Sequence, residues 1–154
     1  MLRRVRRTSL TPTSAGGVRG KMTSLFGITA DRIDETWPRV EKLISDAIDH
    51  GTSRITKDDV YEKLKSREYQ LWIAYEDGIK AVAVTEIVDT ARGRVASIFI
   101  CTGKDMSKWL HHLSEIEVWA KEAGCDIVET LARQGWQRMM PDYKARHIQL
   151  EKMI

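Results

Sequence analysis

Residues 70–76 (QLWIAYE) and 79–88 (IKAVAVTEIV) are two strand-like runs, and the dipeptide Asp77-Gly78 separates them. Asp-Gly between such runs is a strong hairpin signal, because the tightest hairpin turn needs a positive φ at both central positions. A second, looser turn leads into residues 94–101 (RVASIFIC). This stretch therefore predicts three consecutive antiparallel strands.

Helix and strand patterns on both sides extend this meander into an α/β domain. Before it, the pattern predicts a short strand over 24–30, a helix from Asp34 to Gly51 and a helix from near Thr56 to about 66. After it, the pattern predicts a long helix over 105–123, a strand over 126–131, a short helix around 134–140 and a final strand around 145–153. A strand–helix–strand connection of this length predicts a parallel pairing of 126–131.

Composition is that of one globular domain. The chain has 154 residues, of which 42% are hydrophobic and 31% charged. No apolar run approaches the roughly 20 residues that span a bilayer, and no signal-peptide core is present. Two cysteines are too few for a disulfide framework or a four-cysteine zinc site. We expect a cytoplasmic protein that binds no membrane.

Positive charge is concentrated at the N-terminus. Residues 1–21 hold six of the 25 basic residues and no acidic one, which leaves 19 basic and 22 acidic residues, a net −3, in 22–154. We expect this Ser-, Thr- and Gly-rich segment to be a disordered tail. Three interpretations stay open: a basic arm for nucleic acid or an acidic partner, a transit peptide, or codons upstream of a true start at Met22.

The predicted order of elements resembles the GNAT superfamily of N-acetyltransferases. The resemblance covers about residues 24–154, and the segment 124–154 (GCDIVETLARQGWQRMMPDYKARHIQLEKMI) looks like that family's fifth strand, fourth helix and closing strand. It implies a mixed, mostly antiparallel sheet flanked by helices. Compact relatives encoded near phage structural genes look similar to this chain.

The resemblance places an acetyl-CoA site between the fourth strand and the long helix. There, free amides at a helix N-terminus would hold the pyrophosphate. The cofactor-binding candidates are Ile100, Thr102, Gly103, Lys104, Ser107 and Lys108. This stretch has one glycine where the family pattern has two, and we expect Asp105 to be the helix N-cap. Its carboxylate would then occupy the amides and repel a phosphate, so the loop is a degraded form of the motif.

The resemblance also implies a general base and an acid. Glu86 is the candidate base, because it alternates onto the strand face of Val82, Val84 and Val88; the alternative is a solvent-facing carboxylate. With Tyr143 in the aromatic position after the short helix, the family's acid tyrosine falls at Arg138, so this sequence departs from the pattern there. Tyr143 is the candidate acid for the leaving thiolate if the short helix is placed differently, and its alternative role is to pack the closing strand on the sheet.

The remaining side chains predict structure more than chemistry. His111 and His112 are adjacent on the predicted helix and cannot chelate one metal, so we expect surface histidines and no metal site. Cys101 and Cys125 are expected to be buried small hydrophobes. Trp119 is expected off the helix core face, and an exposed patch for a partner or ligand is predicted at Trp136, Arg133 and Arg138.

Two functions follow from this reasoning. The first is an acyl-CoA-dependent N-acyltransferase that acts on an amine substrate, with acetyl-CoA as co-substrate. The second is a catalytically inactive GNAT-like binding or structural protein with a protein partner. They differ at the long helix, because the first needs free amides at its start and the second predicts that Asp105 caps them. Pairing of edge strands could form a homodimer.

Overall fold

The computed structural model describes residues 22–51, 54–132 and 135–154. The predictions on the basic N-terminal tail and on Arg133 lie outside these residues. In chain order the main elements are β1 (Ser24–Ile28), α1 (Ile33–His50), α2 (Lys57–Lys65), β2 (Tyr69–Tyr75), β3 (Ile79–Thr90), β4 (Gly93–Gly103), α3 (Leu113–Glu122), β5 (Ile127–Thr130) and α4 (Trp136–Met139).

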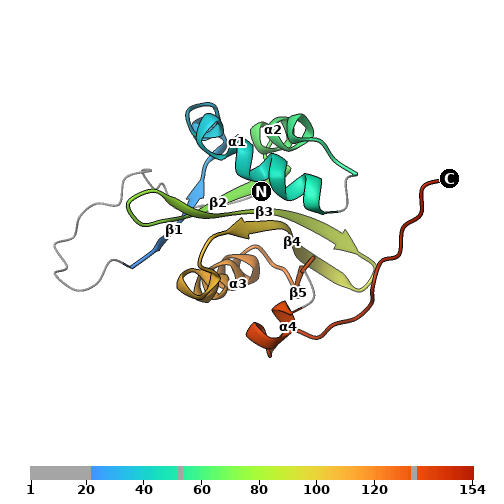
Figure 1. Cartoon of the computed structure of the whole chain (residues 1–154). Coiled ribbons are helices and arrows are strands. Elements are labelled where there is room, and N and C mark those ends of the chain that lie inside the picture. Colours follow the sequence, from blue (N-terminus) through green and yellow to red (C-terminus); the bar gives the residue numbers. More distant parts are fainter. Residues whose placement is uncertain (1–21, 52–53, 133–134) are drawn as a thin grey trace.

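One five-stranded sheet forms the middle layer, with strand order β1-β2-β3-β4-β5. The first four strands are antiparallel to their neighbours, and β5 is parallel to β4 as predicted. Helices α1 and α2 cover one face of the sheet, while α3 and α4 lie on the other (Figure 1). Asp77 and Gly78 form the β2–β3 turn with φ of 51° and 134°, as their sequence predicted.

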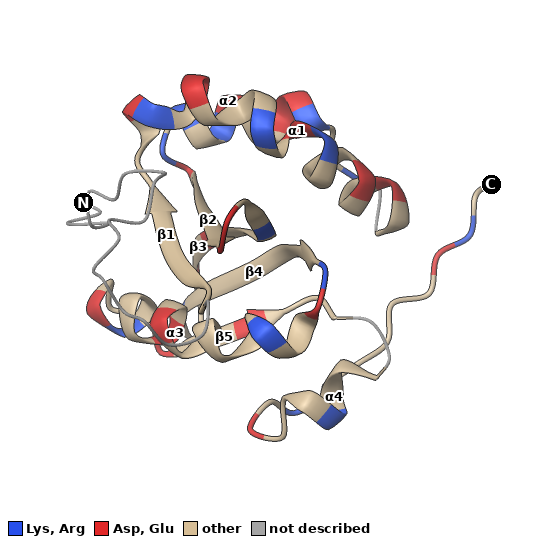
Figure 2. Cartoon of the chain, turned by 60° about the vertical axis from the view of Figure 1, so that its left-hand side comes forward, with Lys and Arg blue, Asp and Glu red and all other residues tan. Residues whose placement is uncertain are grey.

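Each face of the sheet has its own apolar core. Under α1 and α2 the core includes Val40, Ile44, Val60, Leu71 and Val84. Under α3 it includes Trp72, Ala96, Ile98, Ile116 and Trp119. Most charged residues lie on the helices, and the strands between them carry few (Figure 2). Among the described residues, no helix is long and apolar enough to cross a bilayer.

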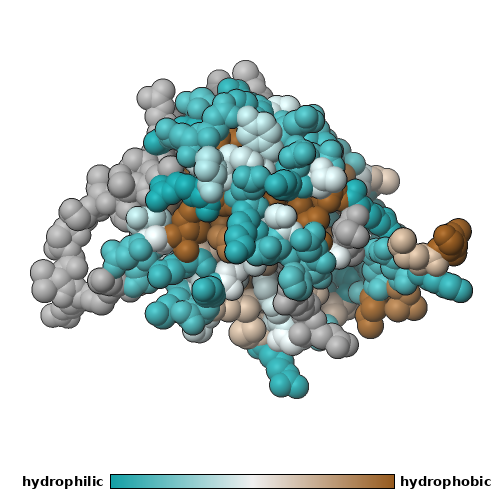
Figure 3. Space-filling model, turned by 45° about the horizontal axis from the view of Figure 1, so that its top comes forward, coloured by the Kyte–Doolittle hydropathy of each residue, from teal (hydrophilic) through white to brown (hydrophobic). Residues whose placement is uncertain are grey.

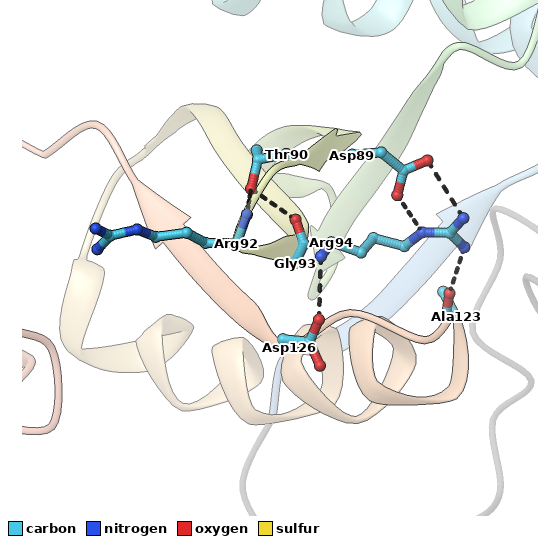
Figure 4. A network of polar contacts seen from close by, with 7 residues as sticks. All are labelled: Asp89, Thr90, Arg92, Gly93, Arg94, Ala123 and Asp126. Carbon is cyan, nitrogen blue, oxygen red and sulfur yellow. Dashed lines mark hydrogen bonds and ion pairs between the residues drawn. The ribbon is translucent and has the colours of Figure 1, made fainter.

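A polar network ties the β3–β4 turn to the end of α3 (Figure 4). The Arg94 guanidinium donates to Asp89 and to the Ala123 carbonyl, over 2.7 and 3.1 Å. The Asp126 carboxylate accepts from the Arg94 amide at 3.1 Å. Gly93 leaves the room for this contact, because a Cβ there would lie 2.5 Å from Oδ2 of Asp126. The network fixes the position at which β5 begins beside β4.

Three predictions about elements are wrong in detail. The first helix begins at Ile33, and Asp34 pairs with Lys65 instead of capping the helix. The predicted helix over 105–123 starts as two 3₁₀ turns, Met106–Lys108 and Leu110–His112, because Trp109 departs from helical geometry with φ of −128°. Residues 145–153 form no strand: Ile148 and Leu150 are 79% and 91% exposed, and no described edge pairs with them.

Candidate active site

β4 and β5 separate half-way along β4. β5 pairs with Val95–Ile98, and the rest of β4 has no strand partner on that side among the residues that the structure describes. At the same point β4 bulges, because Val84 and Thr85 of β3 pair with Ile100 and Ile98, which leaves Phe99 as an extra residue. A bulge of this kind re-aims side chains and leaves a backbone amide outside the ladder. β4 and β5 therefore diverge beyond Ile98, and we call this place the opening between them.

The connection from β4 to α3 begins beside this opening. Asp105 occupies the predicted N-cap position, before the turn Met106–Lys108, but its side chain makes no capping hydrogen bond. Its backbone is left-handed, with φ of 54° and ψ of 59°. In this conformation its carbonyl accepts from the Lys108 amide at 2.8 Å. Within the described chain, the amides of Asp105, Met106 and Ser107 donate to no backbone or side-chain acceptor. The amides that Asp105 was expected to occupy are therefore free.

The predicted cofactor-binding residues divide into two groups. Lys104, Ser107 and Lys108 are exposed at the start of this connection. Ile100 is only 5% exposed and packs into the core beneath α1 and α2, so only its backbone is available to a ligand.

Thr102 and Gly103, two further cofactor-binding candidates, lie in the ladder between β3 and β4. Thr102 is half-buried, and Gly103 has a structural reason to be glycine. Thr102 pairs with Val82, and Gly103 pairs with Ala81. A Cβ on Gly103 would lie 2.5 Å from the Lys80 carbonyl oxygen and 2.6 Å from Cβ of Ala81. The Lys104 amide then donates to that same carbonyl at 3.1 Å. Gly103 thus lets β4 approach β3 closely where the connection begins.

Glu86 lies on the sheet face covered by α1 and α2. It pairs with Tyr69 of β2, whose ring belongs to the core of that face. The Tyr69 ring contacts Phe99 at 4.7 Å between centroids, and Nζ of Lys63 lies 5.1 Å from the Tyr69 centroid. Glu86 itself is half-buried. The predicted face is confirmed, and Glu86 is close to the bulge at Phe99.

Tyr143 lies on the opposite face of the sheet. Its ring packs against the core under α3, and its hydroxyl donates to the Glu117 carboxylate at 3.1 Å. Burial, followed by the nearby charge of Glu117, raises the pKa of the Tyr143 phenol. The sheet separates Tyr143 from Glu86. Its packing partner is α3, since the closing strand that it was expected to hold does not form.

A buried histidine at the start of α3 was missed by sequence reasoning. His112 is 8% exposed, which contradicts the prediction of two surface histidines. Its Nε2 lies 2.9 Å from Oγ1 and 3.1 Å from the carbonyl oxygen of Thr23, and its Nδ1 lies 2.9 Å from Oε2 of Glu115. Oγ1 of Thr23 donates its proton to the Lys108 carbonyl, so His112 faces three acceptors. These bonds fasten the segment before β1 to the β4–α3 connection.

The other side chains under α3 are structural. Trp119 is 7% exposed and packs edge-on against Trp72, so the expectation that it lies off the core face is wrong. Trp136 is half-buried and contacts Trp109, while Arg138 is exposed. Burial raises the pKa of the Cys101 thiol to about 12, as expected of an unreactive core cysteine.

A small apolar hollow lies beneath the start of α3. Its lining includes Leu25, Trp72, Ala81, Cys101, Trp109 and Leu113. Within the described residues, no three His, Cys, Asp or Glu side chains are grouped to hold a metal ion.

Several solved structures with the same architecture are acetyltransferases by name. An aminoglycoside acetyltransferase from an uncultured soil metagenomic sample, in complex with sisomicin, superposes with a TM-score of 0.65 at 8% identity, over 86% of this chain and 97% of its own. A predicted acetyltransferase from Clostridium acetobutylicum with acetyl-CoA gives 0.60 at 18% identity, over 86% and 96%. A GCN5-related N-acetyltransferase from Ralstonia eutropha gives 0.60 at 12% identity, over 86% and 98%.

Comparison by sequence adds no relative, because no family model and no curated protein matches the chain. The chain has the fold of the GNAT acetyltransferases, a five-stranded mixed sheet flanked by helices.

Proposed function

We propose that this chain is an N-acyltransferase that moves the acetyl group of acetyl-CoA to an amine. The observation that carries the proposal is the opening between β4 and β5, which begins at the bulged Phe99. The unpaired edge of β4 can hydrogen-bond an extended ligand as a further strand would, and the pantetheine arm of CoA carries two amides suited to this. Among the similar structures, one was crystallised with acetyl-CoA.

The β4–α3 connection would hold the phosphates. The amides of Asp105, Met106 and Ser107 are free within the described chain, and Lys104 and Lys108 are exposed beside them. Consecutive amides and lysines together favour an anion. The Asp105 carboxylate opposes binding, since it lies on one of the residues whose amide would face the phosphate.

In the reaction the amine nitrogen attacks the thioester carbonyl carbon, so that a C–N bond forms and the C–S bond breaks. In this scheme the Glu86 carboxylate is the general base: it accepts the proton of the attacking amine, directly or through a water. The proton that the leaving thiolate takes up comes from solvent in the simplest scheme. Tyr143 stays a prediction as the donor, because its hydroxyl would first have to leave Glu117.

The alternative function, a non-catalytic binding or structural protein, predicted that the Asp105 carboxylate caps the free amides. The left-handed Asp105 makes no such bond. The observed backbone therefore supports the transferase at the one position where the two functions differ.

The test is calorimetric titration of acetyl-CoA into the full chain, with Asp105→Asn and the matched control Asp49→Asn. We expect micromolar binding by the unaltered chain. We expect about fivefold tighter binding by Asp105→Asn, because one unit charge about 4 Å from another contributes about 1 kcal/mol in water. Asp49, exposed near the end of α1, should change nothing. Failure of both the unaltered chain and Asp105→Asn to bind would end the proposal.

A further inference from the structure

The C-terminal segment, residues 144–154 (KARHIQLEKMI), leaves the body of the molecule. It follows Tyr143, whose ring is held under α3, and every residue from Lys144 to Ile154 is exposed. Within the described chain, no hydrogen bond or ion pair joins this segment to another residue. In both ribbon views its end lies apart from the sheet and the helices (Figures 1 and 2). The segment therefore has no packing partner among the described residues of its own chain.

This segment is apolar for a stretch of chain that faces solvent. Ile148, Leu150 and Met153 are 79%, 91% and 90% exposed. Hydrophobic side chains stand out from the body of the molecule where the chain ends (Figure 3). The alternation of Ile148, Gln149 and Leu150 is typical of a strand with one buried face. The segment thus has the sequence of a strand that lacks a neighbour.

β5 is a sheet edge that lacks a neighbour of the same kind. It is the last strand of the order β1-β2-β3-β4-β5, so its outer side has no strand partner among the described residues. Leu131 continues β5 by one residue, since its amide donates to the Ile98 carbonyl at 3.3 Å. Ile127, Glu129 and Leu131 alternate onto one face and are all exposed. An edge of this kind, with unpaired backbone groups and apolar side chains, is a template for a further strand.

An antiparallel register matches the two sequences. Its pairs on one face are Lys152–Glu129, Leu150–Leu131 and Ile154–Ile127. Opposite charges and apolar side chains directly across from each other both stabilise a sheet. On the other face this direction places Met153 beside the half-buried Val128, whereas the parallel direction would place Glu151 there. A shift by one residue would turn the matched side chains to the wrong face, so the register is well specified.

We infer that two copies of the chain form a dimer by exchanging their C-terminal segments, each of which adds an antiparallel strand to β5 of the other copy. A second copy is the occupant because the segment runs away from its own β5, while the other copy offers the same complementary edge. The exchange is reciprocal, so it closes a two-fold dimer in which both edges are covered. This inference concerns assembly and holds whether or not the chain transfers acyl groups.

The experiment measures the dimer dissociation constant of the full chain by sedimentation equilibrium. The variants are Lys152→Glu, Glu129→Lys and the double variant that carries both changes. Lys144→Glu is the matched control, because it reverses a charge in the same segment but outside the paired residues. The two single variants are also measured as an equal mixture, and thermal unfolding of each variant separates loss of the dimer from loss of the fold.

We expect the unaltered chain to dimerise at micromolar concentration. Each single variant should raise the dissociation constant by about tenfold or more, because like charges replace an attractive pair at both edges of the dimer. The double variant should return it to the value of the unaltered chain, and Lys144→Glu should not change it. The mixture should also dimerise as the unaltered chain does, because exchange sets the introduced acid of one variant opposite the introduced lysine of the other.

Three results would overturn the inference. The first is a chain that stays monomeric throughout the micromolar range. The second is a dimer whose dissociation constant does not respond to the single variants, since another surface would then hold it. The third is a double variant that dimerises while the mixture of single variants does not, because the segment would then pair with β5 of its own chain.

Discussion

Replacement of Gly103 by alanine tests the structural role assigned to this residue. The new methyl group would lie 2.5 Å from the Lys80 carbonyl oxygen, and 2.6 and 2.7 Å from Cβ and Cα of Ala81. Carbon atoms prefer separations of about 3.5–4.0 Å, so the backbones of β3 and β4 must move apart by about 1 Å. Overpacking of this kind costs about 1–3 kcal/mol.

Urea unfolding measures this cost. With a slope of about 2 kcal/mol per molar urea, Gly103→Ala should lower the midpoint by about 1 M at an unchanged slope. Gly51→Ala is the control, because the Cβ there would lie 3.1 Å from the Ala47 carbonyl oxygen and 3.8 Å from that of Ile48, a milder approach, and the backbone has a φ of −105°. A Gly103→Ala midpoint equal to that of the unaltered chain would refute the close approach of β4 to β3. Gly103 would then be free for a role in ligand binding alone.

Three further predictions concern contacts away from the opening. His112→Asn removes the bonds to Thr23 and Glu115 and should lower the free energy of unfolding by about 1–3 kcal/mol in urea; an unchanged midpoint contradicts the contact. Tyr143→Phe should destabilise the chain at pH 7, and this loss should shrink between pH 10 and 11: the folded phenol has a raised pKa, so its contribution is complete below the unfolded pKa and declines above it. An equal loss of unfolding free energy at pH 7 and at pH 11, measured by urea unfolding, would argue against the buried phenol. Arg94→Met should lower the midpoint by less than His112→Asn, because Asp89 is 74% exposed; a larger loss would show that the bond to the Ala123 carbonyl dominates.

Local chemistry explains which elements the sequence could predict. Asp77-Gly78 allows both positive φ values of the hairpin, and Thr56 forms a complete capping box with Asp59. The alternation of Glu86 with Val82 and Val84 placed its face correctly because the irregularity of β3, at Lys80, lies before these residues. These signals lie within a few residues and do not depend on distant contacts.

Tertiary contacts explain the predictions that failed. Asp105 precedes a helical pattern, which favours an N-cap, but Gly103 and Lys104 are fixed on β3 and the chain turns at Asp105 through a left-handed conformation instead. Trp109 interrupts the helix because its ring is buried while its Nε1 donates to the Lys104 carbonyl at 2.8 Å. The strands that these residues contact, β2 and β3, lie far from them in the sequence, so the local pattern cannot reveal the contacts. The bulge at Phe99 has no sequence signal at all, because it is a mismatch between two strands.

The division of the sheet into two faces limits where acyl transfer could occur. Glu86 lies on the face of α1 and α2, whereas the β4–α3 connection leads from the edge of β4 to the opposite face. A ligand held by the amides of that connection can meet an amine on the other face only where the sheet is open. That place lies beyond Ile98, where β5 no longer pairs with β4 and Phe99 leaves the ladder. A substitution that closed the opening should therefore abolish transfer while leaving the binding of the separate amine intact.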